Sequence, residues 1–300
     1  MAFRLDATDL DTLSLIADFR VLSTRQAAIL LQQSDRAVRR RLNQLRDAGL
    51  INLEHRSVGK GRGRPEGVIT LAAGGSETLQ AAGRAVTEVI GPVLQLHALA
   101  HDVLVNWVRV HLVLATRAVS RISLKYHRPP CVPTYARSKA HKSNGTAKES
   151  EPFDLIPDGV FAITDKTSGK SLLFFLEVDM GTESQTSANR DATTILGKLQ
   201  AYKELFRSAG YQRYEKILGA TFRGFRVLFV AHTYARRVQL SRLVEQVKPS
   251  EFIWLTDQDR IFRDGISAEI WSRGGRIDGQ PESILGPTLA CRAPLALSKE

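Results

Sequence analysis

Cysteine is scarce in this sequence, which has only Cys131 and Cys291 among its 300 residues. Two cysteines are too few to form a cysteine-rich zinc site by themselves, and their scarcity is typical of proteins in reducing compartments. Long apolar runs are also missing, because none reaches the roughly 18 residues that a membrane-spanning helix requires. Residues 1–11 carry acidic side chains where a signal peptide needs a basic and then an apolar stretch. We therefore expect a cytoplasmic protein with no membrane partner.

Acidic residues are outnumbered by basic ones, with 31 Asp and Glu against 42 Lys and Arg, a formal net charge of +11 and a pI near 9.9. Such a charge favours a polyanionic partner, because a basic surface releases counterions when it binds phosphates. A hydrophobic fraction of 43% argues against wholesale disorder. Nucleic acid is therefore the first candidate partner.

The chain is long enough for a small domain followed by a larger one. A mixed segment at 76–95, broken by Gly91-Pro92, predicts the boundary between them. We expect a first domain over residues 1–80, a second over 81–275, and a C-terminal tail over 276–300 that is partly disordered.

The first third of the chain predicts three helices and two strands. Apolar positions at helical spacing follow residue 9, Ser23-Thr24 can cap a second helix, and Ser34 can cap a third that ends at Gly49. Strands are expected at 50–53 and 68–71, joined by the basic, glycine-rich loop GKGRGRPE. This order resembles the winged helix-turn-helix family over residues 8–75.

A winged helix uses its third helix and its loop to contact DNA, so the resemblance implies double-stranded DNA as a partner. The predicted DNA-binding residues of the third helix are Arg36, Arg39, Arg40, Arg41 and Asn43, with Arg39, Arg40 and Asn43 as readers of the major groove. Those of the loop are Lys60, Arg62 and Arg64. Alternatively, these arginines form a charge run that only keeps one face of the helix solvated.

The most informative stretch of the second domain is 154–179, where two apolar strands flank a turn at Thr167, Ser168 and Gly169. Asp158 begins one strand, and Glu177 and Asp179 end the other. Because side chains alternate along a strand, Glu177 and Asp179 share one face, and their like charges repel unless a cation or a proton separates them. Three converging carboxylates predict a site for a hard cation.

The Pro-Asp and Glu-x-Asp spacing, followed by a lysine-bearing helix, resembles the restriction-endonuclease-like nuclease superfamily. A hairpin, a helix and then strands alternating with a helix predict an α/β (α+β) fold with a mixed sheet. The resemblance implies an Mg²⁺ or Mn²⁺ ion held by Asp158, Glu177 and the Val178 carbonyl. Asp179 stands where the superfamily has a lysine, and could hold a second metal. Lys198, on the following helix, is then the predicted catalytic lysine. The predicted catalytic set is Asp158, Glu177, Asp179 and Lys198.

The chain as a whole resembles the replication-relaxation family of plasmid and mobile-element proteins, which includes MobC-type relaxases. The similar segments are HALAHDVLV, PDGVF, FLEVDMGTES, ILGKLQAYKELF and FRVLFV, within residues 8–256. This resemblance implies binding at a transfer or replication origin and metal-dependent DNA nicking during plasmid mobilisation, conjugation or replication. Relaxosome proteins and a second copy in a homodimer are further implied partners.

Two alternatives remain open at this stage. The substitution at Asp179 favours a non-catalytic DNA-binding regulator or relaxosome accessory protein with a degenerate nuclease domain. A relaxase with a tyrosine nucleophile would instead use Tyr135, Tyr202 or Tyr234, and would become covalently joined to DNA.

Overall fold

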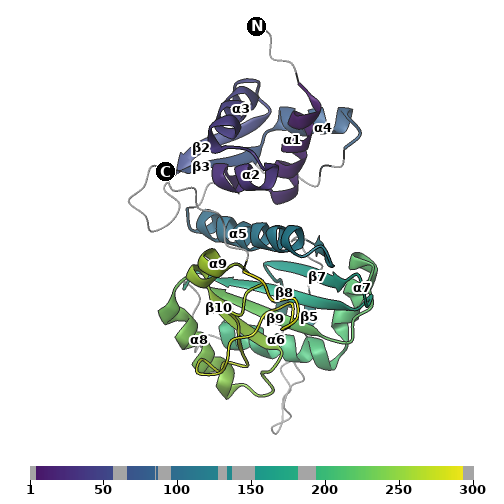
Figure 1. The fold of residues 1–300 in the computed structure, drawn as a ribbon, viewed down its shortest axis with the longest axis vertical. Helices are drawn as coiled ribbons and strands as arrows, with labels where there is room; N and C mark the ends of the chain where they lie inside the picture. Colours follow the sequence, from purple (N-terminus) through teal and green to yellow (C-terminus); the bar gives the residue numbers. More distant parts are fainter. Residues whose placement is uncertain are drawn as a thin grey trace, which may run out of the picture. The chain divides into compact units, whose positions relative to one another are not determined.

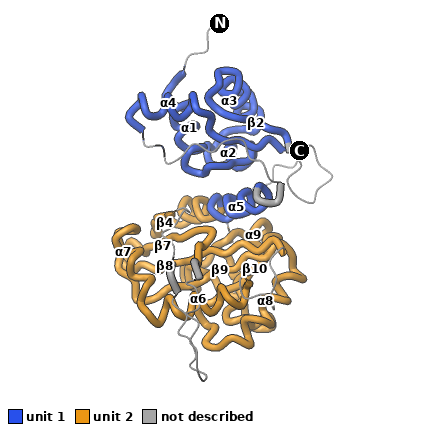
Figure 2. Tube along the Cα trace, turned by 180° about the vertical axis from the view of Figure 1, so that it is seen from behind, with its two compact units in different colours: residues 1–110 blue, residues 111–300 orange. Residues whose placement is uncertain are grey.

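A computed structural model describes residues 5–56, 66–84, 86, 96–127, 134–136, 153–181 and 194–292. The chain divides into two compact units, residues 1–110 and 111–300 (Figure 2). This division falls inside one long helix, α5 (Leu96–Ala118). The sequence places its boundary near residue 80, ahead of that helix.

The first unit is built from short helices and a small antiparallel sheet (Figure 1). Its elements are α1 (Ala7–Phe19), β1 (Leu22–Ser23), α2 (Thr24–Leu31), α3 (Asp35–Asp47), β2 (Ile51–Arg56), β3 (Glu66–Leu71), α4 (Ala73–Ala81) and the first part of α5. The strands lie in the order β1-β3-β2. The predicted helices and strands of this region are therefore present in the predicted order.

Local capping explains where these helices begin. The Ser23 hydroxyl accepts a hydrogen bond from the Gln26 N–H, and the Ser34 hydroxyl accepts one from the Ala37 N–H. Gly49, just after α3, has a positive φ of 73°, as glycines that end helices commonly do. Each helix then buries one apolar face.

Side-chain to backbone hydrogen bonds attach the beginning of α5 to the first unit. The Gln26 side chain donates to the Val103 carbonyl over 2.9 Å, and the Asn106 side chain donates to the Phe19 carbonyl over 3.1 Å. Both side chains are buried, so these bonds satisfy carbonyls and amides that water cannot reach. They account for the position of the unit boundary within α5.

The second unit is an α/β structure with short accessory strands. Its elements after α5 are β4 (Ile122–His127), β5 (Thr134–Ala136), β6 (Phe153–Leu155), β7 (Gly159–Asp165), β8 (Ser171–Asp179), α6 (Ile195–Arg207), a 3₁₀ turn (Gly210–Gln212), α7 (Arg213–Leu218), β9 (Phe225–Ala231), α8 (Tyr234–Gln246), β10 (Ile253–Asp257), α9 (Gln258–Asp264) and β11 (Ser272–Arg273).

The main sheet of this unit is mixed, as the sequence predicts. Among the described residues its strand order is β11-β10-β9-β8-β7-β4. β4, β7 and β8 pair antiparallel, whereas β8, β9 and β10 run parallel. Helices α6 and α8 lie in the two parallel crossovers, which need such connections because parallel strands cannot be joined by a tight turn. The expected α/β fold is confirmed.

One face of the sheet packs against α6, α7 and α8. Leu173 and Phe175 of β8 belong to the same buried cluster as Leu199 and Tyr202 of α6 and Leu240 of α8. Alternation along β8 brings Glu177 and Asp179 to this face too. The other face is packed by rings that include the stacked Phe161 and Phe174, 4.9 Å apart.

Several elements of the second unit have no counterpart in the sequence prediction. They are β4, β5, β6, α7, α9 and β11, which are short and whose apolar patterns are interrupted by polar residues. The predicted helix that carries Lys198 is α6, which begins at Ile195 and is capped by Thr194. Residues 182–193 lie outside the described part.

Part of the predicted C-terminal tail is described. Glu282 pairs with Trp271 through a β-bridge, and Ile284 is buried. Residues 293–300 lie outside the described part, so disorder there stays a prediction. Within the described residues, no helix is long and apolar enough to cross a membrane.

Candidate active site

The β7–β8 hairpin brings Asp158 and Glu177 together. Gly159 pairs with Leu176 in the antiparallel register, which places Asp158 opposite Glu177. The Asp158 N–H donates to the Leu176 carbonyl over 3.0 Å, and Asp158 Oδ2 accepts from the Val178 N–H over 2.7 Å. Asp158 is thus fixed to β8 by both its backbone and its side chain.

Gly159, the residue after Asp158, leaves room for the side chain of Tyr126. A Cβ at position 159 would lie 2.0 Å from the Tyr126 hydroxyl oxygen, on the neighbouring strand β4. A side chain at this position would force the Tyr126 ring to move. The glycine after Asp158 is therefore a packing requirement of the strand that carries the carboxylate.

Glu177 is the most enclosed carboxylate of the site, with 1% of its surface exposed. Its Oε2 accepts a hydrogen bond from Lys198 Nζ over 3.0 Å, and its Oε1 accepts one from the Tyr202 hydroxyl over 2.5 Å. Both donors come from α6, one helical turn apart. The helix therefore holds the carboxylate at both oxygens.

Burial and charge shift the proton affinities of this cluster. Burial and, to a smaller degree, the Asp158 charge raise the pKa of Glu177, and Lys198 and the Tyr202 hydrogen bond lower it, so that the pKa is about 7. Burial and the neighbouring Glu177 carboxylate hold the Tyr202 pKa well above its ordinary value. Glu177 is therefore poised to exchange its proton near neutral pH.

Asp179 has different partners, although it lies only two residues from Glu177 on β8. Its Oδ2 accepts from Arg236 Nε over 2.8 Å, and its Oδ1 accepts from the Gly181 N–H over 2.6 Å. Arg236 lies at the beginning of α8, and its side chain is 11% exposed. A second cationic side chain thus neutralises Asp179 separately from the Glu177 cluster.

The expected convergence of three carboxylates is not formed in the described part of the chain, which holds no group of three or more His, Cys, Asp or Glu side chains suited to a metal ion. The physical reason is the Arg236 ion pair, which engages Asp179. Asp158, Glu177 and the Val178 carbonyl remain as hard oxygen donors, the type that Mg²⁺ and Mn²⁺ prefer. A cation would also relieve the repulsion between the two carboxylates, so these residues fit a divalent ion.

The tyrosines considered as nucleophiles lie in unlike surroundings. Tyr202 is completely buried and donates to Glu177, so its oxygen cannot reach a DNA phosphate in this arrangement. Tyr234 is 58% exposed at the first position of α8. The side chain of Tyr135 lies outside the described residues.

In the first unit, most of the predicted DNA-binding residues of α3 face solvent. Arg36, Arg39, Arg40 and Asn43 are exposed, while Val38, Leu42 and Leu45 are buried. Arg39 lies 3.8 Å from Asp35, one turn earlier, a weak surface ion pair. The apolar face of α3 therefore packs inward and leaves a basic face outward.

Arg41 differs from its neighbours. Its guanidinium forms a two-pronged ion pair with the buried Asp9 of α1 and also bonds to Gln44. Asp9 in turn accepts from the Asp6 N–H in the capping box of α1. Arg41 thus links α3 to α1. The loop residues Lys60, Arg62 and Arg64 lie outside the described residues.

Sequence reasoning missed two partners of the carboxylates. Tyr202 was considered only as a possible nucleophile, yet its spacing of four residues from Lys198 places both side chains on one helix face. Arg236 follows the apolar strand β9 and the Thr233 cap, but no local signal shows that α8 begins beside the end of β8. That proximity depends on the order of strands in the sheet.

No curated protein matches the chain. A solved structure of the MunI restriction endonuclease in complex with cognate DNA is similar at 14% identity and a TM-score of 0.20, covering 61% of this chain and 85% of that one. A TM-score this low adds no weight. The model of the replication-relaxation family, in contrast, matches residues 13–221, from α1 to the end of α7, and the chain therefore belongs to the replication-relaxation family.

Proposed function

We propose that this protein binds double-stranded DNA through its first unit and nicks DNA in an Mg²⁺- or Mn²⁺-dependent reaction in its second unit. The observation that carries the proposal is the buried Glu177 carboxylate, held by Lys198 and Tyr202 and placed opposite Asp158. Burying an acid beside another acid is costly unless the pair serves a cation or a proton.

The first unit supports the DNA-binding half of the proposal. The order of three helices and a β-hairpin is that of a winged helix, and the exposed face of α3 carries Arg36, Arg39, Arg40 and Asn43. We assign α3 to the major groove, where arginine and asparagine can read base edges. Arg41 stabilises the unit and is assigned no DNA contact.

In the second unit, Asp158 and Glu177 would hold the divalent ion together with the Val178 carbonyl. When bound, such an ion acidifies a coordinated water and stabilises negative charge on a phosphate. Tyr202 keeps the Glu177 carboxylate in one orientation, and Lys198 supplies a positive charge next to it. With a phosphodiester in the site, the Lys198 ammonium can turn to a phosphate oxygen and stabilise the charge that develops there.

The decisive experiment uses supercoiled plasmid that carries the cognate origin. With Mg²⁺, we expect the wild-type protein to convert it to the nicked circle, and the double variant Asp158→Asn, Glu177→Gln to lose this activity by at least a thousandfold. The matched control is Asp259→Asn, Glu245→Gln, which changes one exposed Asp and one exposed Glu elsewhere in the unit. Nicking by the site variant at the wild-type rate would refute the assignment.

A direct readout of the ion complements the activity. Titration with Mn²⁺, followed by calorimetry, should give one bound ion in the wild-type protein and a large loss of affinity in the site variant. The control variant should bind Mn²⁺ as the wild type does.

One observation favours a second candidate function, a DNA-binding regulator or relaxosome accessory protein that cuts nothing. Asp179 occupies the superfamily's lysine position, and Arg236 neutralises it, which leaves two carboxylates in place of three. This function predicts salt-sensitive DNA binding that needs no divalent ion. Wild-type protein that binds origin DNA in EDTA, and neither nicks it nor binds Mn²⁺, would establish this alternative.

A further inference from the structure

The second unit contains a large groove at the opposite end of the sheet from the candidate active site. The groove has a volume of about 940 Å³, near the upper limit for small-ligand pockets, roughly 300–1,000 Å³. Its lining includes Ser171, the first residue of β8, whereas Glu177 lies six residues further along the same strand. At about 3.3 Å per residue, these positions are roughly 20 Å apart.

Basic side chains dominate the charge of this groove. Its lining has five, Lys125, Lys170, Arg223, Arg226 and Arg273, against one acidic residue, Glu251. Glu251 is already paired with Arg273 over 3.1 Å and with Arg276 over 3.0 Å. The groove therefore carries a clear excess of positive charge.

Three of these cations are exposed and have no acidic partner among the described residues, namely Lys125, Lys170 and Arg223. This contrasts with Lys198 and Arg236, which are committed to buried carboxylates. Arg226 is partly buried over the Trp254 ring at 4.1 Å, and burial together with the nearby Arg273 charge lowers its pKa. An anion in the groove would stabilise all of these charges.

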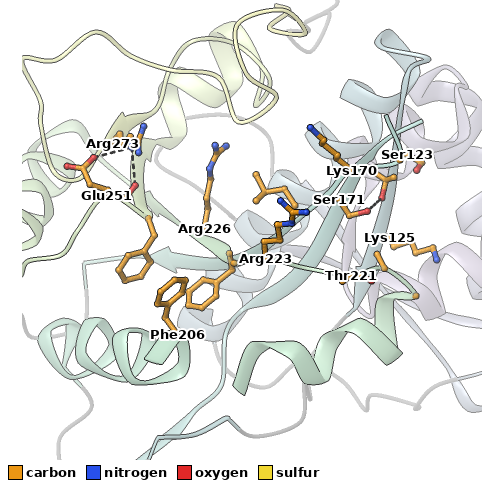
Figure 3. Close-up of a pocket in the computed structure, with 18 residues that line it drawn as sticks. Ser123, Lys125, Lys170, Ser171, Phe206, Thr221, Arg223, Arg226, Glu251 and Arg273 are labelled. Atoms are coloured by element: carbon orange, nitrogen blue, oxygen red, sulfur yellow. Dashed lines mark hydrogen bonds and ion pairs between the residues drawn. The ribbon is translucent and has the colours of Figure 1, made fainter. Parts of the chain in front are cut away.

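An aromatic side chain completes the groove. Phe206, at the end of α6, is 49% exposed although its ring is held by neighbours. Phe252 and Tyr211 lie nearly parallel to it, with centroids 6.4 Å and 6.0 Å away, and Phe225 meets it edge-on at 5.9 Å. Figure 3 shows Phe206 on one side of the groove and Lys125 and Lys170 on the other, with Arg223 labelled between them.

From these features we propose that the groove is a second nucleic-acid site, which binds single-stranded DNA by stacking a base on Phe206 and pairing its phosphates with Lys170, Arg223 and Lys125. Exposed rings beside a basic groove are how proteins bind single strands without reading sequence. A duplex cannot use Phe206 in this way, because its bases are already stacked on one another. The site requires neither a divalent ion nor nicking, so it goes beyond the function proposed above.

The test measures binding of a fluorescein-labelled oligo-dT 12-mer by the full-length protein, using fluorescence anisotropy at several salt concentrations. The first variant, Lys170→Gln, Arg223→Gln, should bind the 12-mer about tenfold more weakly. Its affinity should also fall less steeply with salt: the slope of log K against log salt should be about 1.4 less negative, since each of two lost phosphate contacts contributes ~0.7. The matched control, Lys216→Gln, Arg242→Gln, removes one exposed lysine and one exposed arginine outside the groove. It should bind like the wild type.

The second variant isolates the ring. Phe206→Leu keeps an apolar side chain against Phe225, so the fold should be retained, which circular dichroism can verify. Its affinity for the 12-mer should fall about tenfold with an unchanged salt slope, because stacking and not charge is lost.

Three outcomes would overturn the proposal. The first is equal losses in the groove and control variants, which would indicate a general charge effect. The second is that the groove variant loses as much affinity for a labelled 12-base-pair duplex as for the single strand, which would indicate a surface that binds duplex DNA. The third is displacement of the 12-mer by oligo-glutamate together with no effect of Phe206→Leu, which would indicate an acidic peptide as the partner. All of these binding measurements are made in EDTA and do not depend on nicking. Failure of this proposal therefore leaves the nicking proposal unaffected.

Discussion

The two ends of strand β8 use positive charge in opposite ways. At its end, Glu177 and Asp179 are almost fully buried, and each holds a cation from a different helix, Lys198 or Arg236. At its beginning, Lys170 and Arg223 face solvent without acidic partners in the described part of the chain. Desolvated ion pairs can orient groups for chemistry, whereas exposed cations attract a polyanion.

The largest expected effect comes from breaking the Arg236–Asp179 pair. Arg236→Met leaves Asp179 buried without its cation, which should destabilise the second unit by about 3–5 kcal/mol. Urea unfolding measures this loss. Arg242→Met, an exposed position on the same helix, should change the stability by no more than ~0.5 kcal/mol. Equal stability of the two variants would contradict the contrast between the two ends of β8.

A comparable effect on activity is expected from Lys198. Lys198→Met removes the cation next to Glu177 and should slow nicking by about 100–1,000-fold, the range found when one charge-stabilising donor is removed. The rate of plasmid nicking at saturating Mg²⁺ measures this. Lys216→Met, an exposed lysine of α7, serves as the control and should nick at the wild-type rate. Wild-type nicking by Lys198→Met would remove Lys198 from the mechanism.

The smallest expected effect is on pH dependence. Protons and the divalent ion compete for Glu177, whose pKa is raised to about 7, so Mn²⁺ affinity should rise with pH and level off above that value. Tyr202→Phe removes a hydrogen bond that lowers this pKa, so the rise should move to higher pH. Mn²⁺ titrations between pH 5.5 and 8.5 measure the displacement. A curve that moves to lower pH would contradict the role of Tyr202.

The raised pKa of Glu177 also makes the folding stability depend on pH. The folded pKa of Glu177 lies above the ordinary value of 4.5, so the protonated form is favoured in the folded chain. Its stabilising contribution is complete below pH 4.5 and is lost as the pH rises through about 7. The folding stability of Glu177→Gln, measured by urea unfolding, should therefore change less between pH 4.5 and about 7 than that of the wild type.

The hairpin that carries the site could be predicted from the sequence because its signals are local. Apolar runs of strand length flank a turn that contains Gly169, whose φ is 67°, and the Asp158 and Glu177 positions follow from the register. Lys198 could be nominated because α6 follows β8 directly. These inferences need only neighbouring elements.

The partners of Asp179 and the basic groove depend on distant parts of the chain and could not be predicted in this way. Arg236 meets Asp179 because β9 pairs with β8 and α8 follows β9. The groove combines residues from β4, the β7–β8 turn, α6 and the segment before β9. Only the strand order of the sheet brings these segments to one end, and no periodicity in the sequence records that order.

The close contact between Gly159 and Tyr126 restricts which residues can occupy position 159. The Tyr126 hydroxyl oxygen lies 2.0 Å from the position that a Cβ at 159 would take. Even alanine at 159 would force the Tyr126 ring, which stacks on Phe161 at 5.9 Å, to shift. In a saturation library scored for nicking, position 159 should tolerate as few substitutions as position 158. A smaller residue at 126 should restore nicking to some of the variants at position 159.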